Sequence, residues 1–102
     1  MVWVLHLKVE SKNTSGEIMA QFEPEMFDWI YVDGNHYYEY VLEDLRLSYD
    51  KLKTSGLLAG DDYNWGKELG YPVKQAVTDF LYEGDKGELR VYGSQFVIQK
   101  LG

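Results

Sequence analysis

Apolar and polar positions repeat with two different periods along the 102-residue chain. Short apolar runs between turn-forming residues predict strands, and apolar residues spaced three or four apart predict helices. The expected strands are Val2–Val9, Phe27–Val32, Leu57–Gly60, Leu89–Tyr92 and Phe96–Leu101, and the expected helices are Ser15–Phe22, His36–Lys53 and a third that begins at Pro72. This alternation indicates an α/β fold with a mostly parallel sheet and three helices, closed by an antiparallel C-terminal hairpin.

Four residues at the ends of these segments support the predicted boundaries. Pro24 follows the first helix and is expected to end it. Asn35 precedes the long second helix and is expected to cap its N-terminus. Gly56 lies just beyond that helix, where a glycine commonly ends one. Pro72 occupies the first position of the third helix, where its missing N–H costs nothing.

Composition narrows the class of protein. The chain is 45% apolar and 26% charged, and no apolar run approaches the roughly 18 residues of a membrane span, so we expect a globular protein without a membrane partner. The absence of cysteine excludes disulfides and thiolate metal sites, and it fits a cytoplasmic location. The net charge of −7 argues against nucleic acid as a partner, because phosphate binding needs a basic surface.

Acidic residues follow two strands of the predicted sheet. Asp33 comes directly after Phe27–Val32, and Asp61 and Asp62 come after the next strand. Adjacent parallel strands lie about 4.8 Å apart, so carboxylates at their ends converge, and Mg²⁺ or Ca²⁺ is the usual compensation. His36 starts the following helix and is a candidate base, ligand or cap. Taken singly, a turn or a cap explains each residue better than a site does. Taken together at one sheet edge, the residues leave a structural role and a ligand or metal site equally open.

Aromatic residues leave a similar choice open. Tyr37, Tyr38 and Tyr40 cluster near the acidic edge, as do Tyr63 and Trp65. They indicate either ordinary core packing or a pocket or interface lined by rings. The sequence lacks the motifs typical of phosphate-binding loops and zinc sites. It contains no G-x-G-x-x-G loop, no G-x-x-x-x-G-K loop and no H-x-x-x-H zinc pair.

Four segments together resemble class I S-adenosylmethionine-dependent methyltransferases, in particular those that methylate oxygens of small molecules. These segments are residues 27–39, 42–45, 52–63 and 73–77, and they contain an F-D-x-x-x-x-D-G-x-H strand ending and a later D-D-Y. The similarity extends over about residues 15–101. It implies a Rossmann-like sheet and a single domain over residues 1–102 that corresponds to the C-terminal half of a methyltransferase and lacks the first two strands.

The resemblance also implies a set of site residues. By position, Asp33, Gly34 and Asn35 would contact S-adenosylmethionine. Asp33 together with Asp61 and Asp62 would bind Mg²⁺, as in the metal-dependent relatives. The glycine-rich loop and the ribose-binding acid that hold most of the cofactor in this family have no counterpart in the sequence.

The remaining implications concern catalysis and partners. His36 matches a family histidine close to the acceptor and would be catalytic, whereas Ser55 stands where the family usually has a glycine of a turn. The function implied is O-methyl transfer to a small-molecule acceptor. One alternative is a non-catalytic remnant that acts as an oligomeric or interaction module, and another is a metal-binding domain without transfer activity.

Without the first two strands, the family's third strand would pair directly with its fourth, and the order in the family's numbering would become 3-4-5-7-6. Right-handed crossovers then put all three helices on one face of the sheet. The other face would be bare, and exposed apolar sheet invites a partner. We therefore expect either a homo-oligomer or a companion chain that supplies the missing N-terminal half.

Overall fold

The computed structural model describes residues 2–7, 14–34 and 36–101. In chain order the elements are β1 (Val4–Leu7), α1 (Thr14–Met19), β2 (Phe27–Val32), α2 (Tyr38–Lys51), β3 (Leu52–Gly60), the short 3₁₀ helix η1 (Lys67–Leu69), α3 (Pro72–Tyr82), β4 (Gly87–Tyr92) and β5 (Gln95–Lys100). The α/β class, the three α-helices and the C-terminal hairpin expected from the sequence are confirmed.

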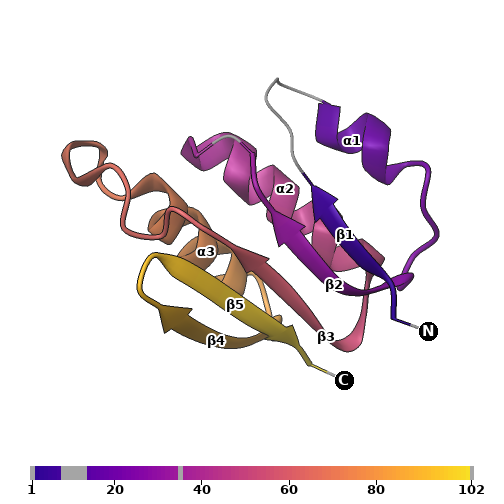
Figure 1. Ribbon diagram of the computed structural model, residues 1–102. Coiled ribbons are helices and arrows are strands. Elements are labelled where there is room, and N and C mark those ends of the chain that lie inside the picture. Colours follow the sequence, from indigo (N-terminus) through magenta and orange to yellow (C-terminus); the bar gives the residue numbers. More distant parts are fainter. Residues whose placement is uncertain (1, 8–13, 35, 102) are drawn as a thin grey trace.

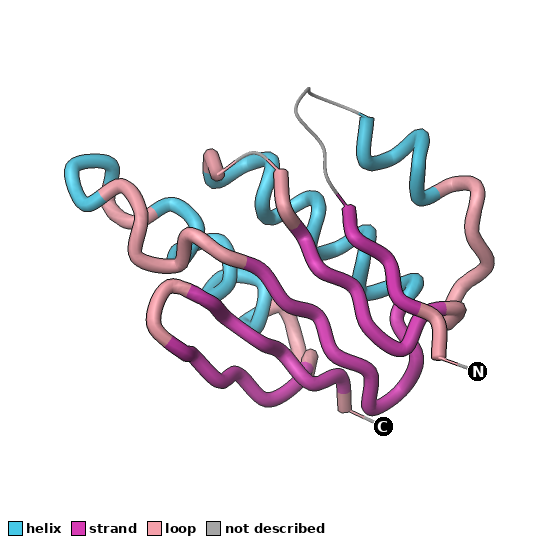
Figure 2. Tube along the Cα trace, viewed as in Figure 1, coloured by secondary structure: helices cyan, strands magenta, loops and turns pink. Residues whose placement is uncertain are grey.

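The five strands form one sheet in the order β1-β2-β3-β5-β4. The first three strands are parallel, β5 runs antiparallel to β3, and β4 pairs with β5 at the far edge. This is the order that the resemblance implies once the family's first two strands are left out. Figures 1 and 2 show the helices on one side of the sheet, as right-handed crossovers require.

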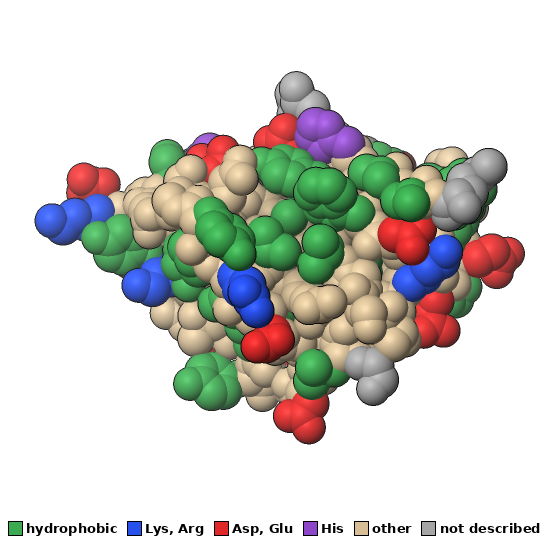
Figure 3. Space-filling view, turned by 60° about the horizontal axis from the view of Figure 1, so that its bottom comes forward, with side chains coloured by type: hydrophobic (Ala, Val, Ile, Leu, Met, Phe, Trp, Pro, Cys, Tyr) green, Lys and Arg blue, Asp and Glu red, His purple; other side chains and the backbone are tan. Residues whose placement is uncertain are grey.

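The hydrophobic core lies between the sheet and this layer of helices. Alternate strand residues point into it and are almost fully buried, among them Leu7, Ile30, Leu58 and Ile98. The helices contribute Leu45, Val77 and Phe80, which are fully buried. The intervening strand residues point away from the helices, and Val4 and Trp29 remain 57% and 44% exposed. We call this uncovered side of the sheet the open face, and Figure 3 shows hydrophobic side chains gathered on it.

Two of the predicted helix boundaries are wrong. Helix α1 ends at Met19, five residues before Pro24, so the proline does not terminate it. The backbone N–H of Phe22 still donates to the carbonyl of Met19, which leaves a turn in place of the last predicted helical residues. Helix α2 begins at Tyr38 with Tyr37 as its N-cap, and no side chain caps it. The predicted cap, Asn35, lies outside the described residues.

The predicted glycine cap after α2 is also wrong. The chain passes from Lys51 directly into β3, because fully buried Leu52 already pairs with Phe27 of β2. Pairing is then irregular until Trp29 meets Leu57, so residues 53–56 form a bulge. Within the bulge Ser55 has a φ of 66°, in the left-handed region that favours glycine.

Gly56, the other small residue of the bulge, is needed for space. A Cβ at this position would lie 2.8 Å from the carbonyl oxygen of Lys53 and 2.9 Å from that of Asp28. Both neighbours are backbone atoms in the sheet and cannot move away cheaply. The two residues therefore respond to substitution in opposite directions.

We predict that Ser55→Gly raises the free energy of unfolding by about 0.5–1 kcal/mol, because it removes the cost of a left-handed non-glycine residue. Gly56→Ala should lower it by about 1–3 kcal/mol through the backbone clash. Urea unfolding of both variants beside the wild type measures these changes. Equal effects of the same sign would contradict the assigned bulge.

A hydrogen-bonded group joins α2 to α3 and makes stability depend on pH. The Tyr38 hydroxyl donates to Asp79 Oδ2 at 2.6 Å, and this bond raises the pKa of Tyr38 above its usual value. A raised folded-state pKa stabilises the fold below the unfolded pKa of about 10, and the contribution is lost as pH rises through the higher folded value.

We therefore predict that wild type is more stable than Tyr38→Phe at neutral pH and that the difference disappears as the pH rises past about 10. Thermal or urea unfolding between neutral and alkaline pH measures it. Tyr82→Phe, at an 85% exposed tyrosine on the helix that carries Asp79, is the matched control and should show no such trend. A pH-independent difference for Tyr38→Phe would contradict the prediction.

Candidate functional site

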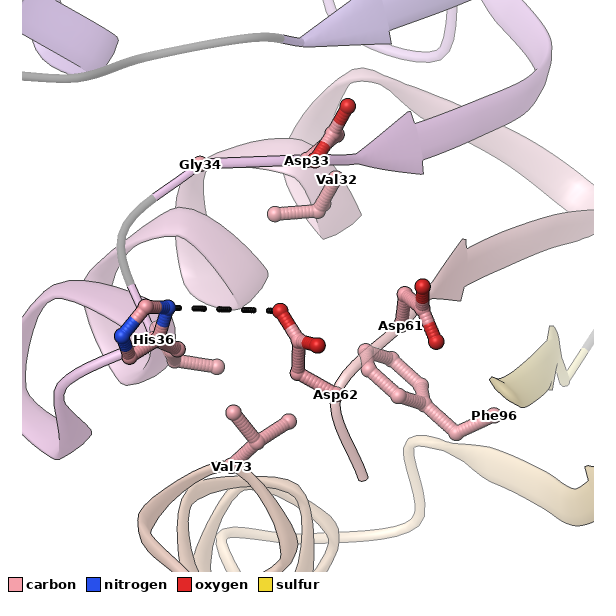
Figure 4. Close-up of a pocket in the computed structure, with 9 residues that line it drawn as sticks. Val32, Asp33, Gly34, His36, Asp61, Asp62, Val73 and Phe96 are labelled. Carbon is pink, nitrogen blue, oxygen red and sulfur yellow. Dashed lines mark ion pairs between the residues drawn. The ribbon is translucent and has the colours of Figure 1, made fainter. Parts of the chain in front are cut away.

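A small hollow opens at the carboxyl ends of β2 and β3. Its polar lining comes from Asp33, His36, Asp61 and Asp62. Its apolar walls include Val32, Val73 and Phe96, whose positions Figure 4 shows. The cavity volume is about 20 Å³, enough for about one water molecule or a single ion.

The register of the parallel strands creates this grouping. Val32, the last residue of β2, pairs with Gly60, the last residue of β3, so Asp33 and Asp61 emerge side by side. The ring of Phe96 packs directly against Gly60, because a Cβ at this position would lie only 2.4 Å from the ring. The structure thus brings Asp33, Asp61 and Asp62 to one edge, as the sequence predicts.

The carboxylates nevertheless point in different directions. In Figure 4 Asp62 reaches toward His36, whereas Asp33 and Asp61 turn away from it. Asp33 Oδ2 lies 3.1 Å from Nε2 of His6, a β1 residue that also packs edge-on against Tyr31. Asp33 is therefore engaged by the side chain of His6, which the sequence analysis did not connect with the acidic edge.

Asp61 is held by the hairpin. The Ser94 hydroxyl donates to Asp61 Oδ1 at 2.7 Å, and the Ser94 carbonyl accepts the backbone N–H of Tyr63 at 2.8 Å. The Asn64 side-chain amide donates to the carbonyl of Gly93 at 3.0 Å. Three hydrogen bonds thus clamp the loop after β3 to the β4–β5 turn.

Asp62 and His36 form an ion-pair contact across the hollow that is longer than a hydrogen bond. Asp62 has a φ of 63°, a left-handed conformation that aspartate tolerates better than most residues. Its Oδ2 lies 4.0 Å from His36 Nδ1. The Trp65 ring packs against the imidazole in a tilted arrangement, with ring centroids 3.7 Å apart and an angle of 52° between the ring planes. The imidazole therefore contacts both a carboxylate and an aromatic ring.

Electrostatics at this edge are negative. Burial raises the pKa of Tyr31, and the charges of Asp61, Asp33 and Asp62 raise it further. The phenol stays protonated at neutral pH, so Tyr31 adds no charge of its own. The edge therefore favours a cation or a hydroxyl donor over an anion.

Within residues 2–7, 14–34 and 36–101, no group of three acidic or histidine side chains is arranged to hold a metal ion. The three predicted Mg²⁺ ligands share an edge, but Asp33 is bonded to His6 and Asp61 to Ser94. Of the predicted cofactor contacts, Asp33 and Gly34 line the hollow, and Asn35 lies outside the described residues. These assignments stay predictions.

Sequence reasoning missed Ser94 and the pairing of His6, and it noted Trp65 only as one of several aromatics. The pairing of β1 with β2 explains the His6 contact. His6 lies opposite Tyr31, and Asp33 follows Tyr31 by two residues on the same face of the sheet. The Ser94 contact spans 33 residues and depends on the hairpin folding back beside β3. No local pattern predicts such a contact.

We predict that Ser94→Ala frees Asp61 and loosens the loop, at a cost of about 0.5–1.5 kcal/mol in the free energy of unfolding. Amide hydrogen exchange at Tyr63 should quicken. Ser94→Thr keeps a hydroxyl and is the control, since it should exchange close to the wild-type rate. Equal exchange in wild type and Ser94→Ala would show that the hydroxyl holds nothing in place.

No helix in the part of the chain that the structure describes is long and apolar enough to cross a membrane. Among curated proteins, none matches the sequence. Among solved structures, the chain superposes on MycE, a methyltransferase from the mycinamycin biosynthetic pathway in complex with Mg and SAH, with a TM-score of 0.63 and 16% identity over 85% of this chain and 28% of that one.

A second similar structure is the T. thermophilus 16S rRNA methyltransferase RsmC in complex with AdoMet and guanosine, with a TM-score of 0.54 and 13% identity over 100% of this chain and 36% of that one. The chain thus spans about a third of the length of either protein, and these likenesses establish the fold. A family profile described as a methyltransferase domain matches residues 4–63. That match covers β1 to the end of the acidic edge, and the chain therefore belongs to the methyltransferase-domain family, as its sequence motifs indicate.

Proposed function

We propose that this chain forms the acceptor side of an S-adenosylmethionine-dependent methyltransferase that transfers a methyl group to an oxygen of a small molecule. The observation that carries the proposal is the pair of His36 and Asp62, which face each other across the hollow at the carboxyl ends of the parallel strands. Ligands of open α/β sheets bind at this edge. RsmC acts on RNA, but the net charge of −7 here favours a small acceptor.

In this proposal His36 is the general base. Its Nδ1 lies 4.0 Å from Asp62 Oδ2. When the two close to hydrogen-bond distance on acceptor binding, the proton is held on Nδ1, and Nε2 is free to accept the proton of an acceptor hydroxyl. Asp62 then stabilises the imidazolium that results. Trp65 restricts the rotation of the ring. When bound, S-adenosylmethionine supplies the electrophilic methyl group.

The described residues fit the acceptor better than the cofactor. The hollow of about 20 Å³ is far smaller than S-adenosylmethionine, and the sequence has no glycine-rich loop to hold its methionine or ribose. A second pocket, of about 600 Å³, lies between the start of α2 and η1. Its lining includes Tyr37, Tyr38, Tyr40 and Leu69. An acceptor ring would stack there beside His36.

Binding of Mg²⁺ by Asp33, Asp61 and Asp62 is a separate part of the proposal. Carboxylate oxygens are the ligands that Mg²⁺ prefers, but the present side-chain directions of the described residues do not form a site. Asp33 would have to leave His6, and Asp61 would have to leave Ser94. Metal binding therefore competes with two hydrogen bonds.

The methyltransferase proposal is tested by calorimetry with S-adenosylhomocysteine and by transfer of a labelled methyl group to a panel of small hydroxylated aromatics. We expect weak binding of S-adenosylhomocysteine by the wild type. His36→Ala should bind it equally well but transfer about 10²–10⁴-fold more slowly. Tyr82→Ser, remote from the hollow, is the control. No binding at millimolar ligand would refute the enzyme proposal for this chain.

Titration with Mg²⁺ tests the metal site independently of activity. Asp62→Asn should weaken binding by about tenfold or more. His6→Ala and Ser94→Ala should strengthen it, because each releases a carboxylate from a competing hydrogen bond. If all four proteins bind Mg²⁺ equally, the three aspartates do not form the site.

The second candidate function is a non-catalytic interaction module with the methyltransferase fold. Its supporting observation is the open face, where Val4 and Trp29 stay exposed although they lie in paired strands. Absence of cofactor binding together with stable self-association would favour this candidate over the enzyme.

A further inference from the structure

The open face carries a continuous apolar strip across the sheet. In one row Val4 of β1 pairs with Trp29 of β2, which pairs with Leu57 of β3. In the next row Tyr31 and Val97 flank Ala59. A shallow hollow of about 410 Å³ lies over this strip, and its lining includes the apolar Trp29, Leu57 and Val97 as well as the polar Glu88, Arg90 and Gln99. Isolated exposed apolar residues are common, but an ordered strip of this kind marks an interaction surface.

Arg90 lies at one margin of this strip and a carboxylate at the other. Arg90 of β4 lines the hollow beside Glu88 and has no ion-pair or hydrogen-bond partner among the described residues. At the other margin His6 holds Asp33, whose side chain is 47% exposed. The pairing register places Arg90 and His6 at opposite ends of the same row across the five strands.

We propose that the open face binds a second copy of this chain, related by a two-fold axis that lies between the two sheets and runs parallel to β3. Such an axis exchanges the margins, so β4 of each copy lies over β1 of the other. Rotation about this axis does not change the position of a residue along the strand direction. Arg90 of one copy therefore lies opposite the His6–Asp33 pair of the other. The apolar strip of each copy meets the other strip.

In such an isologous interface the same surface of both copies takes part, so each contact occurs twice. Packed sheets align to within about 30° of each other, which suits strands that run parallel to the axis. Each Arg90 gains a carboxylate partner, and the exposed Trp29 is covered. A head-to-tail stack would leave one margin of each copy unpaired.

The size of the face sets the expected affinity. Five strands about 4.8 Å apart and about six residues long give a footprint of roughly 400–500 Å² per copy. Over both copies this is about 800–1,000 Å², which is smaller than a standard specific interface, so we expect a weak dimer. The charge of −7 on each copy opposes association, so the dimer should tighten when salt is raised from low to physiological concentration.

Sedimentation velocity of the full chain up to about 200 µM tests the proposal, with circular dichroism to confirm that each variant is folded. Trp29→Gln removes the largest side chain of the strip. Arg90→Glu and Asp33→Lys each place like charges opposite one another in both symmetry-related contacts. Each of the three should weaken dimerisation about tenfold or more. Tyr82→Ser, on the helix side, should dimerise like the wild type.

An equimolar mixture of Arg90→Glu and Asp33→Lys gives the decisive measurement. In the mixed dimer the glutamate introduced in one copy would face the lysine introduced in the other, while the second contact keeps its native Arg90 and Asp33. The mixture should therefore recover dimerisation to within about threefold of wild type. Failure to recover would refute the two-fold arrangement.

Two further results would overturn the proposal. A folded wild-type monomer at about 200 µM would leave the open face to a different polypeptide, including a companion methyltransferase half. A dimer insensitive to all three variants would point to edge pairing through β1 instead.

Discussion

The parallel pairing of β2 with β3 is the constraint on which the rest of the structure depends. Because Val32 lies opposite Gly60, the chain leaves both strands at the same level, and three aspartates follow at once. The same pairing requires a crossover, and α2 supplies it on the side that right-handed connections prescribe. The site and the one-sided helix layer therefore have one cause.

The one-sided layer of helices gives the sheet a covered face and an open face. Side chains that point toward the helices make the core, and those that point away remain exposed on the open face. The hollow lies at the edge of the sheet where the helix side and the open face meet, so its carboxylates can point to either side. Asp62 turns to the helix side with His36, whereas Asp33 turns to the open face with His6. The two carboxylates therefore belong to different surfaces of the molecule.

Periodicity predicted most of the fold because it records which face of each element is buried. Val73, Val77 and Phe80 predict α3, and the structure buries all three. Boundaries were less predictable, since tertiary contacts decide them. Glycine after α2 suggested a cap, but burial of Leu52 against Phe27 draws the chain straight into β3. The strain of the bulge then falls on Ser55, which has a positive φ.

The position of the site was predictable and its internal geometry was not, because the two depend on different information. Strand ends fix where Asp33, Asp61 and Asp62 lie. Their directions depend on competitors from distant segments, His6 in β1 and Ser94 in the hairpin turn. A hydrogen bond of this kind contributes only about 1 kcal/mol net, so a bound cation can outweigh both. The directions of Asp33 and Asp61 are therefore set by hydrogen bonds to distant segments, and the bond to His6 places Asp33 on the open face.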